Sequence, residues 1–281
     1  MNTVGIVSPG FMGAGLGGAL RAGGARVVAT VDGRSARSRR LAGEAGLELL
    51  PTLNDVVAAA EVVLVVTPPG DAVRAATAIR GAAAATRSSP LVADLNAVSP
   101  ATMARVEEAL DGLRLVDGSI SGPPPSERPG ARLFLCGAEA DVVADLPWDG
   151  QVEPMVLGTE VGSASALKMC TGSVYKGLTA LITQAMRTAG AYGVLEEVVS
   201  DLERNGLGTT AGVARSATKA WRFVDEMREV AATQAAAGLT PQLFATVAEI
   251  YGQVSETALA QGDPESAREL SAAEVVRLLG R

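Results

Sequence analysis

The chain has 281 residues, enough for one large domain or two smaller ones, and with 48% hydrophobic but only 3% aromatic residues its core must be mainly aliphatic. The net charge of −7 argues against a nucleic-acid-binding protein, and the absence of histidine removes the commonest acid/base group and metal ligand. Cys136 and Cys170 are too few for a disulfide framework or a metal site. We therefore expect two buried thiols, no metal, and a cytosolic chain with neither a signal peptide nor a membrane span.

The first half of the chain alternates between short apolar runs and helical segments, which predicts βαβ units and a largely parallel sheet. The expected strands are residues 4–7, 26–31, 47–49, 61–67, 91–95, 113–116, 131–136 and 152–156. Expected helices follow the first glycine turn, cover residues 35–45 and 71–84, and begin at the Asn54-Asp55 and Ser99-Pro100 pairs. Turns at the strand ends then place ligands at the carboxyl edge of the sheet.

The second half shows only helical periodicity. We expect helices over residues 162–192, 195–205, 210–237, 241–260 and 264–279. The predicted organisation is therefore an α/β domain over residues 1–158, followed by an all-helical domain over residues 159–281.

A glycine-rich turn follows the first strand and reads Ser8-x-Gly10-Phe11-Met12-Gly13. Glycines at such a junction allow a sharp turn, a close approach of phosphates and tight helix packing, and the free N–H groups of the helix N-terminus attract a pyrophosphate. The pattern predicts a dinucleotide site. Because Ser8 stands in the place of the usual first glycine, a purely structural turn remains the alternative.

The end of the second strand usually decides between NAD and NADP, because an acid there binds the ribose 2′-hydroxyl and basic residues accept a 2′-phosphate. That position falls on Thr30, or on Asp32 if the strand is longer. The residues that follow suit a phosphate monoester: Arg34, Ser35, Arg37, Ser38, Arg39 and Arg40. They favour NADP(H) over NAD(H), although Asp32 points the other way and a solvated basic helix face is the alternative.

The first helix of the second domain carries two of the three lysines of the chain, Lys168 and Lys176. Helical spacing places Lys168, Gly172, Tyr175 and Thr179 on one face. A partly buried lysine near the carboxyl edge of the sheet can act as a general acid/base. The alternative is a lysine that extends to solvent from an interdomain helix.

Four motifs in order carry a family resemblance: the glycine turn, residues 94–100 (DLNAVSP), residues 117–122 (DGSISG), and Gly162 followed six positions later by Lys168. The chain resembles the β-hydroxyacid dehydrogenases, which include 3-hydroxyisobutyrate dehydrogenase and the N-terminal part of 6-phosphogluconate dehydrogenase. Its helical half looks most like a branch with an uncharacterised C-terminal domain. The resemblance implies a Rossmann-type doubly wound parallel sheet followed by an all-α helical domain.

By similarity, Lys168 is the general acid/base in hydride transfer between the nicotinamide and a small hydroxy acid or its aldehyde or ketone partner. Ser121 and Gly122 hold the acidic group of an anionic substrate. The cofactor is held at the pyrophosphate by Gly10, Phe11, Met12 and Gly13, and at the nicotinamide ribose by Thr67, Pro68 and Asn96. The resemblance also implies a homodimer formed through the helical domain.

Two departures from the family pattern bear on the substrate. Gly172 stands where the family has an asparagine, so that anchor is missing or is supplied by Thr171 or Tyr175. The candidate catalytic residues are Lys168, Ser121 and Tyr175. The Ser121-Gly122 loop continues as three prolines that lack N–H donors, which suggests a substrate of another shape. Two other functions stay open: an imine reductase, which Lys168 argues against and Tyr175 favours, and a non-catalytic NADPH-binding sensor or structural subunit.

Overall fold

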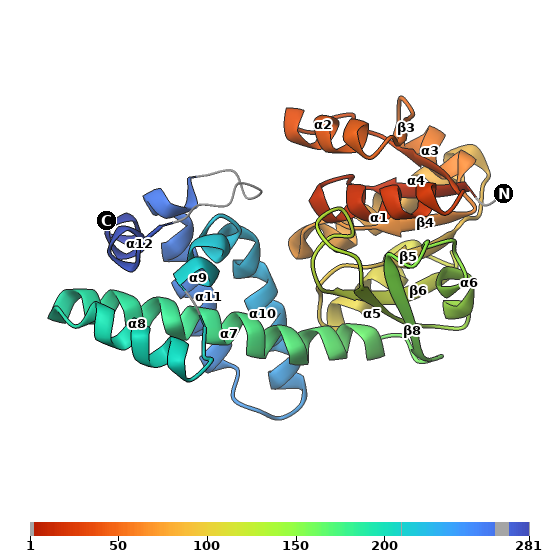
Figure 1. Ribbon diagram of the computed structural model, residues 1–281. Helices are drawn as coiled ribbons and strands as arrows, with labels where there is room; N and C mark the ends of the chain where they lie inside the picture. Colours follow the sequence, from red (N-terminus) through yellow and green to blue (C-terminus); the bar gives the residue numbers. More distant parts are fainter. Residues whose placement is uncertain (1–2, 209, 262–269, 281) are drawn as a thin grey trace. The chain divides into compact units, whose positions relative to one another are not determined.

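The computed structural model describes residues 3–208, 210–261 and 270–280 (Figure 1). The chain separates into two compact units, Met1–Lys168 and Met169–Arg281. Helix α7 (Ser163–Tyr192) belongs to both, because it begins in the first unit and continues in the second. The boundary expected at residue 158 falls at the end of the last strand, before this helix begins.

The first unit contains one eight-stranded sheet with the order β3-β2-β1-β4-β5-β6-β7-β8. Strands β1 to β6 are parallel, β7 is antiparallel to β6, and β8 is parallel to β7. The largely parallel sheet expected from the sequence is therefore confirmed. The strands are β1 (Thr3–Val7), β2 (Arg26–Ala29), β3 (Glu48–Leu49), β4 (Val62–Val65), β5 (Leu91–Asp94), β6 (Leu115–Ser121), β7 (Ala131–Cys136) and β8 (Val152–Gly158).

The sixth strand is present, but its predicted end at residue 116 was wrong. Strand β6 runs on through Asp117 to Ser121, and antiparallel pairing with β7 from Asp117↔Cys136 to Ser121↔Arg132 supports this polar half. Polar and glycine residues suggested a loop. Backbone pairing and the contacts of Asp117 with helix α7 stabilise a strand there instead.

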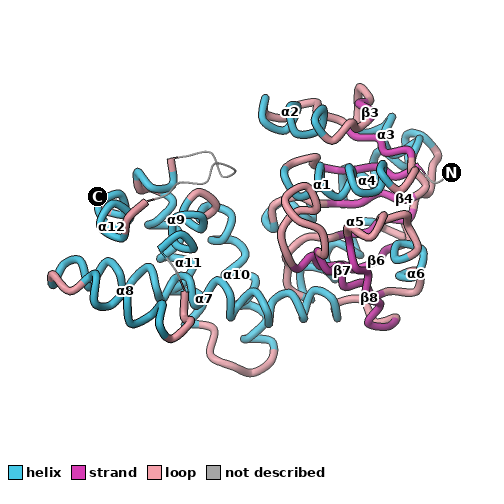
Figure 2. Tube along the Cα trace, in the orientation of Figure 1, coloured by secondary structure: helices cyan, strands magenta, loops and turns pink. Residues whose placement is uncertain are grey.

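Helices accompany the strands of the first unit (Figure 2). They are α1 (Phe11–Ala22), α2 (Ala36–Glu44), α3 (Leu53–Ala59), the 3-10 turn η1 (Pro69–Asp71), α4 (Ala72–Thr86), α5 (Pro100–Leu110) and the unpredicted α6 (Ala140–Ala144). The start at Ser99-Pro100 is confirmed, since Ser99 accepts a hydrogen bond from the Thr102 N–H. The start assigned to Asn54-Asp55 was wrong: Thr52 is the N-cap, and Asp55 completes its capping box.

The core of the first unit consists of two apolar clusters built from alternate strand residues. Ile6 and Leu64 belong to one cluster, while Val63 and Val65 belong to the other. Successive side chains of a strand point to opposite faces, so this sheet is buried on both sides. Because both faces are buried, the strands of this sheet appear in the sequence as continuous apolar runs.

The described part of the second unit contains helices and no strand, as expected. After α7 come α8 (Leu195–Arg204), α9 (Thr210–Ala217), α10 (Ala220–Ala236), α11 (Gln242–Ser255), the 3-10 turn η2 (Ala258–Ala260) and α12 (Ala272–Leu279). The single helix expected over residues 210–237 was wrong, because Lys219 has a non-helical backbone (φ −113°, ψ 0°) and separates α9 from α10. The expected start at Pro264 lies outside the described residues.

The two cysteines differ in their surroundings. Cys136 is buried, as expected, whereas Cys170 is exposed, so the prediction of a second buried thiol was wrong. Of the helices in the described ranges, none has both the length and the apolarity needed to cross a membrane.

Candidate active site

The glycine turn after β1 keeps its shape despite the serine. Ser8 has φ = 71°, the left-handed conformation that glycine adopts without strain, and its carbonyl accepts a 2.7 Å hydrogen bond from the Gly10 N–H. A left-handed backbone costs a residue with a side chain about 1–2 kcal/mol. Ser8 therefore adopts a backbone conformation open to the usual first glycine, with this energetic cost.

The next two glycines differ in their surroundings, because Gly13 packs against the turn whereas Gly10 borders open space. A Cβ on Gly13 would lie 2.6 Å from the Ser8 carbonyl oxygen, so only glycine fits there, while a Cβ on Gly10 would meet nothing within 4 Å. Gly10 caps α1 with no side-chain hydrogen bond, and Phe11 and Met12 form the first turn. The N–H groups and positive dipole end of this turn fit a pyrophosphate.

The loop after β2 joins that strand to α2. The Thr30 hydroxyl donates to the Pro51 carbonyl (3.2 Å) and accepts from the Asp32 N–H (3.3 Å), so it helps to shape the loop. Ser35 caps α2 and accepts from the Ser38 N–H (3.2 Å). Arg34 lies between them and is half-buried. Of the three candidates for binding the adenosine ribose, Thr30 and Ser35 thus already make hydrogen bonds within the loop and helix α2.

The arginines after β2 differ in their partners. Arg40 pairs with Glu44 at 3.0 Å. In the described ranges, neither Arg34 nor Arg39 has a carboxylate partner, and Asp32 is exposed. Two guanidinium groups therefore remain without a protein carboxylate at the place where a 2′-phosphate is expected.

The loops after β4 and β5 are tied together by a buried amide. The Asn96 Oδ1 accepts from the Thr67 N–H (2.6 Å), and the Asn96 Nδ2 donates to Asp94 (3.1 Å). Burial raises the pKa of Asp94 to about 7; the hydrogen bonds from Asn96 oppose this shift, and the nearby Asp117 adds to it. With only 2% of its surface exposed, Asn96 holds the Thr67 loop in place.

Thr67 carries an unsatisfied group at this edge of the sheet. Its Oγ1 is buried and has no hydrogen-bond partner among the described residues. An unpaired buried hydroxyl costs about 1–3 kcal/mol, which a ligand hydroxyl would offset. Pro68, the next residue, is extended and precedes η1. The group fits the predicted role in binding a ribose.

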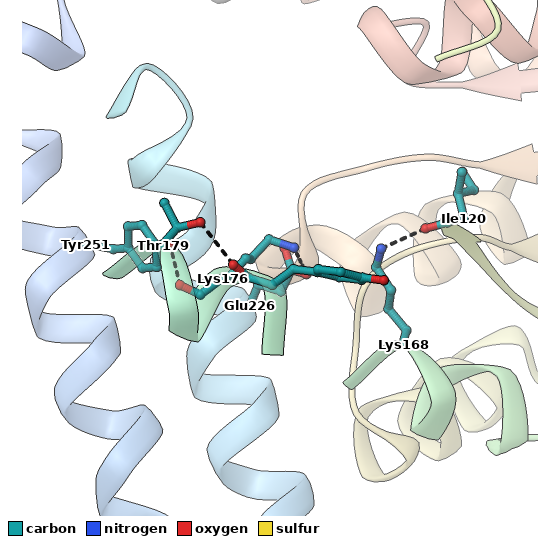
Figure 3. A network of polar contacts seen from close by, with 7 residues as sticks. Ile120, Lys168, Lys176, Thr179, Glu226 and Tyr251 are labelled. Carbon is teal, nitrogen blue, oxygen red and sulfur yellow. Dashed lines mark hydrogen bonds and ion pairs between the residues drawn. The ribbon is translucent and has the colours of Figure 1, made fainter. Parts of the chain in front are cut away.

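Lys168 lies beside the Ser121-Gly122 loop, which the family resemblance predicts to bind the substrate. Its Nζ donates a 2.7 Å hydrogen bond to the Ile120 carbonyl, one residue before Ser121 (Figure 3). Ser121 ends β6 and is half-buried, and Gly122 follows it. The fold of the first unit thus brings Lys168, Ser121 and Gly122 together from segments 48 residues apart.

Two of the three prolines after Gly122 pack on helix α1. Pro124 and Pro125 are buried, and a Cβ on Gly15 of α1 would lie 3.1 Å from the Pro124 Cβ. Prolines have no N–H. The donors left in this segment for a substrate are the Ser121 hydroxyl and the Gly122 N–H.

The start of α7 is held by the Asp117 carboxylate, for which the sequence motifs imply no role. Asp117 is fully buried and accepts from the Gly162 N–H (2.8 Å), the Ser165 N–H (3.1 Å) and the Ser165 hydroxyl (2.8 Å). The Cys136 thiol donates to the same carboxylate at 3.2 Å, and burial raises its pKa to about 11, so it stays protonated. The contacts span up to 48 residues, so no local pattern shows them.

The remaining candidates, Thr171 and Tyr175, lie on the part of α7 that belongs to the second unit. Thr171 is half-buried, and Tyr175 is exposed over 68% of its surface. A Cβ on Gly172, where the family has asparagine, would lie 3.4 Å from the Glu226 Oε1. A carboxylate therefore occupies the space beside this glycine.

Glu226 belongs to a buried network of the second unit (Figure 3). It pairs with Lys176 at 2.5 Å, and the Lys176 Nζ lies 5.0 Å from the centre of the Phe223 ring. The Tyr251 hydroxyl donates to the Lys176 carbonyl at 2.8 Å. The lysine and the glutamate neutralise each other and join α7 to α10 and α11.

The sheet order and the glycine turn at the end of β1 define the class of protein: a Rossmann-type dinucleotide-binding domain followed by a helical domain. The model of the NAD binding domain of 6-phosphogluconate dehydrogenase matches residues 3–147, just over half of the chain, so the protein belongs to this family. Residues 189–254 match the Domain of unknown function (DUF1932). The family resemblance is confirmed, and the protein is a dehydrogenase-type NAD(P)-binding oxidoreductase.

Individual proteins resemble the chain at lower identity. An uncharacterized 28.5 kDa protein from Methanothermus fervidus is 26% identical over 181 residues, which cover 63% of this chain and 67% of that protein. A 3-hydroxyisobutyrate dehydrogenase from Salmonella typhimurium is 17% identical, with a TM-score of 0.73 and 99% of both chains covered. An imine reductase variant from Myxococcus stipitatus is 18% identical, with a TM-score of 0.54 and full coverage of both chains. The two structures share the fold.

Proposed function

We propose that the protein is an NADP(H)-dependent oxidoreductase that interconverts a small hydroxy acid and its aldehyde or ketone partner, with Lys168 as the general acid/base. One observation carries the proposal: the Lys168 Nζ donates to the Ile120 carbonyl beside the Ser121-Gly122 loop. An amine at that place is close to donors that suit a substrate. Its hydrogen bond to a backbone carbonyl keeps it oriented.

Proton transfer is the part of the reaction that this chain supplies. When bound, the nicotinamide cofactor supplies or takes up the hydride. In reduction, Lys168 as an ammonium gives a proton to the carbonyl oxygen, and in oxidation the neutral amine removes the proton from the hydroxyl. The Ser121 hydroxyl and the Gly122 N–H hold the acidic group of the substrate, so that the reacting carbonyl or hydroxyl oxygen faces Lys168.

The cofactor is proposed to lie along the carboxyl edge of the first six strands. The turn from Gly10 to Gly13, including Phe11 and Met12, holds the pyrophosphate, and Thr67, Pro68 and Asn96 serve the nicotinamide ribose. Thr30, Arg34 and Ser35 serve the adenosine ribose. The unpaired guanidinium groups of Arg34 and Arg39 support NADP(H) over NAD(H).

Cofactor preference is tested by direct binding. Arg34→Ala should weaken NADPH binding about 10-fold or more, because a charge-assisted hydrogen bond contributes about 1.5–3 kcal/mol. Binding of NADH should change little. Arg40→Ala is the matched control, since Arg40 already pairs with Glu44. Equal affinity of the unmodified protein for NADH and NADPH would overturn the preference.

Activity is tested with NADPH and separate panels of aldehydes, keto acids and cyclic imines. We expect turnover of an anionic aldehyde or keto acid, and a fall of about 10²–10⁴-fold to a measurable residual rate in Lys168→Ala. Lys168→Arg is the matched variant, because it keeps the charge but cannot release a proton at neutral pH. Undiminished turnover in either variant would refute the acid/base role.

The same panels separate the other two functions. Turnover of cyclic imines alone would make the protein an imine reductase, which the fold shared with such an enzyme and the exposed Tyr175 keep in view. NADPH binding without turnover of any panel would indicate a sensor or structural subunit. If one of the panels is turned over, the change in KM in Thr171→Ala and Tyr175→Phe shows which side chain takes the place of the family's asparagine.

We further propose a cytosolic homodimer that pairs through the helical unit. Val174, Leu178 and Leu181 form a stripe on α7 and remain exposed by 64%, 38% and 59%. Apolar side chains at this spacing favour burial against another helix. Light scattering at micromolar concentration should give the mass of two chains, and a monomer would refute the dimer.

A further inference from the structure

We infer that Asp117 is a positioning residue: its carboxylate caps helix α7 from strand β6 and so holds Lys168 beside the Ile120 carbonyl. The inference rests on the proposed function in one respect, that Lys168 is the acid/base. The contacts themselves stand without it.

A carboxylate buried in a protein needs hydrogen-bond donors around it, because its oxygens have lost their contacts with water. Asp117 accepts from four donors, namely the Gly162 N–H, the Ser165 N–H, the Ser165 hydroxyl and the Cys136 thiol. Three of these groups belong to the N-terminal end of α7, which is where the helix dipole favours a negative charge.

The helix has no cap of its own at this end. Gly162, just before the first residue, has no side chain, whereas Ser or Asp at this position would accept a hydrogen bond from the first turn. The Ala164 N–H is also satisfied from the sheet, by the Cys136 sulfur at 3.3 Å. Strands β6 and β7 thus supply the cap that the local sequence lacks.

The capped turn leads directly to the lysine. Ser165 and Lys168 are three residues apart, so they project from the same side of α7. Ser165 contacts Asp117, and Lys168 contacts Ile120, on the same strand. Two contacts along one strand fix both the rotation and the axial position of the helix. Without the Asp117 contact, the first turn frays and the Lys168 amine loses its fixed place.

The test compares Asp117→Asn with Ser119→Ala. Ser119 lies two residues further along β6, is buried, and has a hydroxyl without a partner among the described residues, so its loss should be silent. Asp117→Asn should lower kcat about 10-fold or more, since an amide nitrogen replaces one of the two oxygens that accept hydrogen bonds from the start of α7. NADPH affinity should stay within about twofold, because the hydrogen-bond partners of Asp117, namely Cys136, Gly162 and Ser165, are not among the residues proposed to hold the cofactor.

Two readouts separate positioning from general damage. In a Lys168→Ala background, Asp117→Asn should have no further effect on kcat, because its effect acts through the lysine. Amide hydrogen exchange should speed up at the Gly162 and Ser165 N–H groups, and not at α5. An equal loss of kcat in both backgrounds, or unchanged exchange, would overturn the inference.

If Asp117→Asn fails to fold, Ser165→Ala gives the same test more mildly, because it removes only the 2.8 Å hydroxyl contact. It should lower kcat about threefold in the parent and not in Lys168→Ala. No loss in the parent would overturn the inference. Failure of the proposed function looks different: Lys168→Ala itself would keep full turnover, while the exchange result would still report on the cap.

Discussion

Glycine at position 15 is predicted to set how closely the proline loop packs on helix α1. An alanine Cβ there would lie 3.1 Å from the Pro124 Cβ, 3.2 Å from the Ser126 Oγ and 3.3 Å from the Pro125 Cδ. In a helix interior, Gly→Ala stabilises by about 1 kcal/mol, whereas overpacking costs about 1–3 kcal/mol. Gly15→Ala should therefore change stability by between about zero and −2 kcal/mol.

Gly18, one turn further on, is the matched control. An alanine Cβ there would lie 3.7 Å from the Ala45 Cβ, an ordinary contact, so Gly18→Ala should gain the full ~1 kcal/mol. The two variants should thus differ by about 1–3 kcal/mol. Urea denaturation is followed by the fluorescence of buried Trp148 in a Trp221→Phe background, so that only the first unit reports.

Substrate kinetics extend the comparison to the site. Because the proline loop continues the Ser121-Gly122 segment, Gly15→Ala should raise the KM of the substrate severalfold, while Gly18→Ala should leave it unchanged. Equal stability of the two variants would refute the packing argument. Unequal stability with equal KM would show that the loop moves without affecting the substrate donors.

Three further predictions concern single groups. Ser8→Gly relieves the left-handed strain and should stabilise by about 0.5–1 kcal/mol after the entropy of the unfolded glycine is subtracted, as measured by urea denaturation. Burial raises the pKa of Asp94 from 3.8 to about 7, so folding favours the protonated carboxyl. This favourable contribution to the free energy of unfolding is complete below pH 4 and is lost as the pH rises to 7. The stability of the parent relative to Asp94→Asn should therefore fall by up to about 4 kcal/mol over that range. Glu226→Ala leaves Lys176 buried without its partner and should cost about 3–5 kcal/mol, which Lys176→Met should largely restore, as followed by Trp221 fluorescence.

Each of these three has a result that contradicts it. A destabilised Ser8→Gly would show that the serine side chain stabilises the turn. A stability difference independent of pH would mean that Asp94 stays ionised in the folded protein. If the Lys176→Met and Glu226→Ala effects simply add, the two groups do not interact in solution.

Much of the fold could be predicted because its signals are local. Buried parallel strands are continuous apolar runs, such as residues 62–65 in β4, and the Ser99-Pro100 pair marks a helix start. The break between α9 and α10 had no such signal. Neither glycine nor proline stands near Lys219, so the local sequence does not mark the end of a helix there.

The sequence by itself determined the class of protein, through the order of its motifs, and the residue type at each proposed site. Only the tertiary structure decided which of these residues meet. Lys168 reaches Ile120 across 48 residues, and Asp117 caps a helix that begins 45 or more residues later. The physical reason is that a hydrogen bond depends on distance in space, and a chain that folds back on itself makes that distance independent of separation in sequence. Ser8 is a second case that only the structure decides: the surrounding turn holds it in a left-handed conformation, so a serine takes the place of the usual glycine.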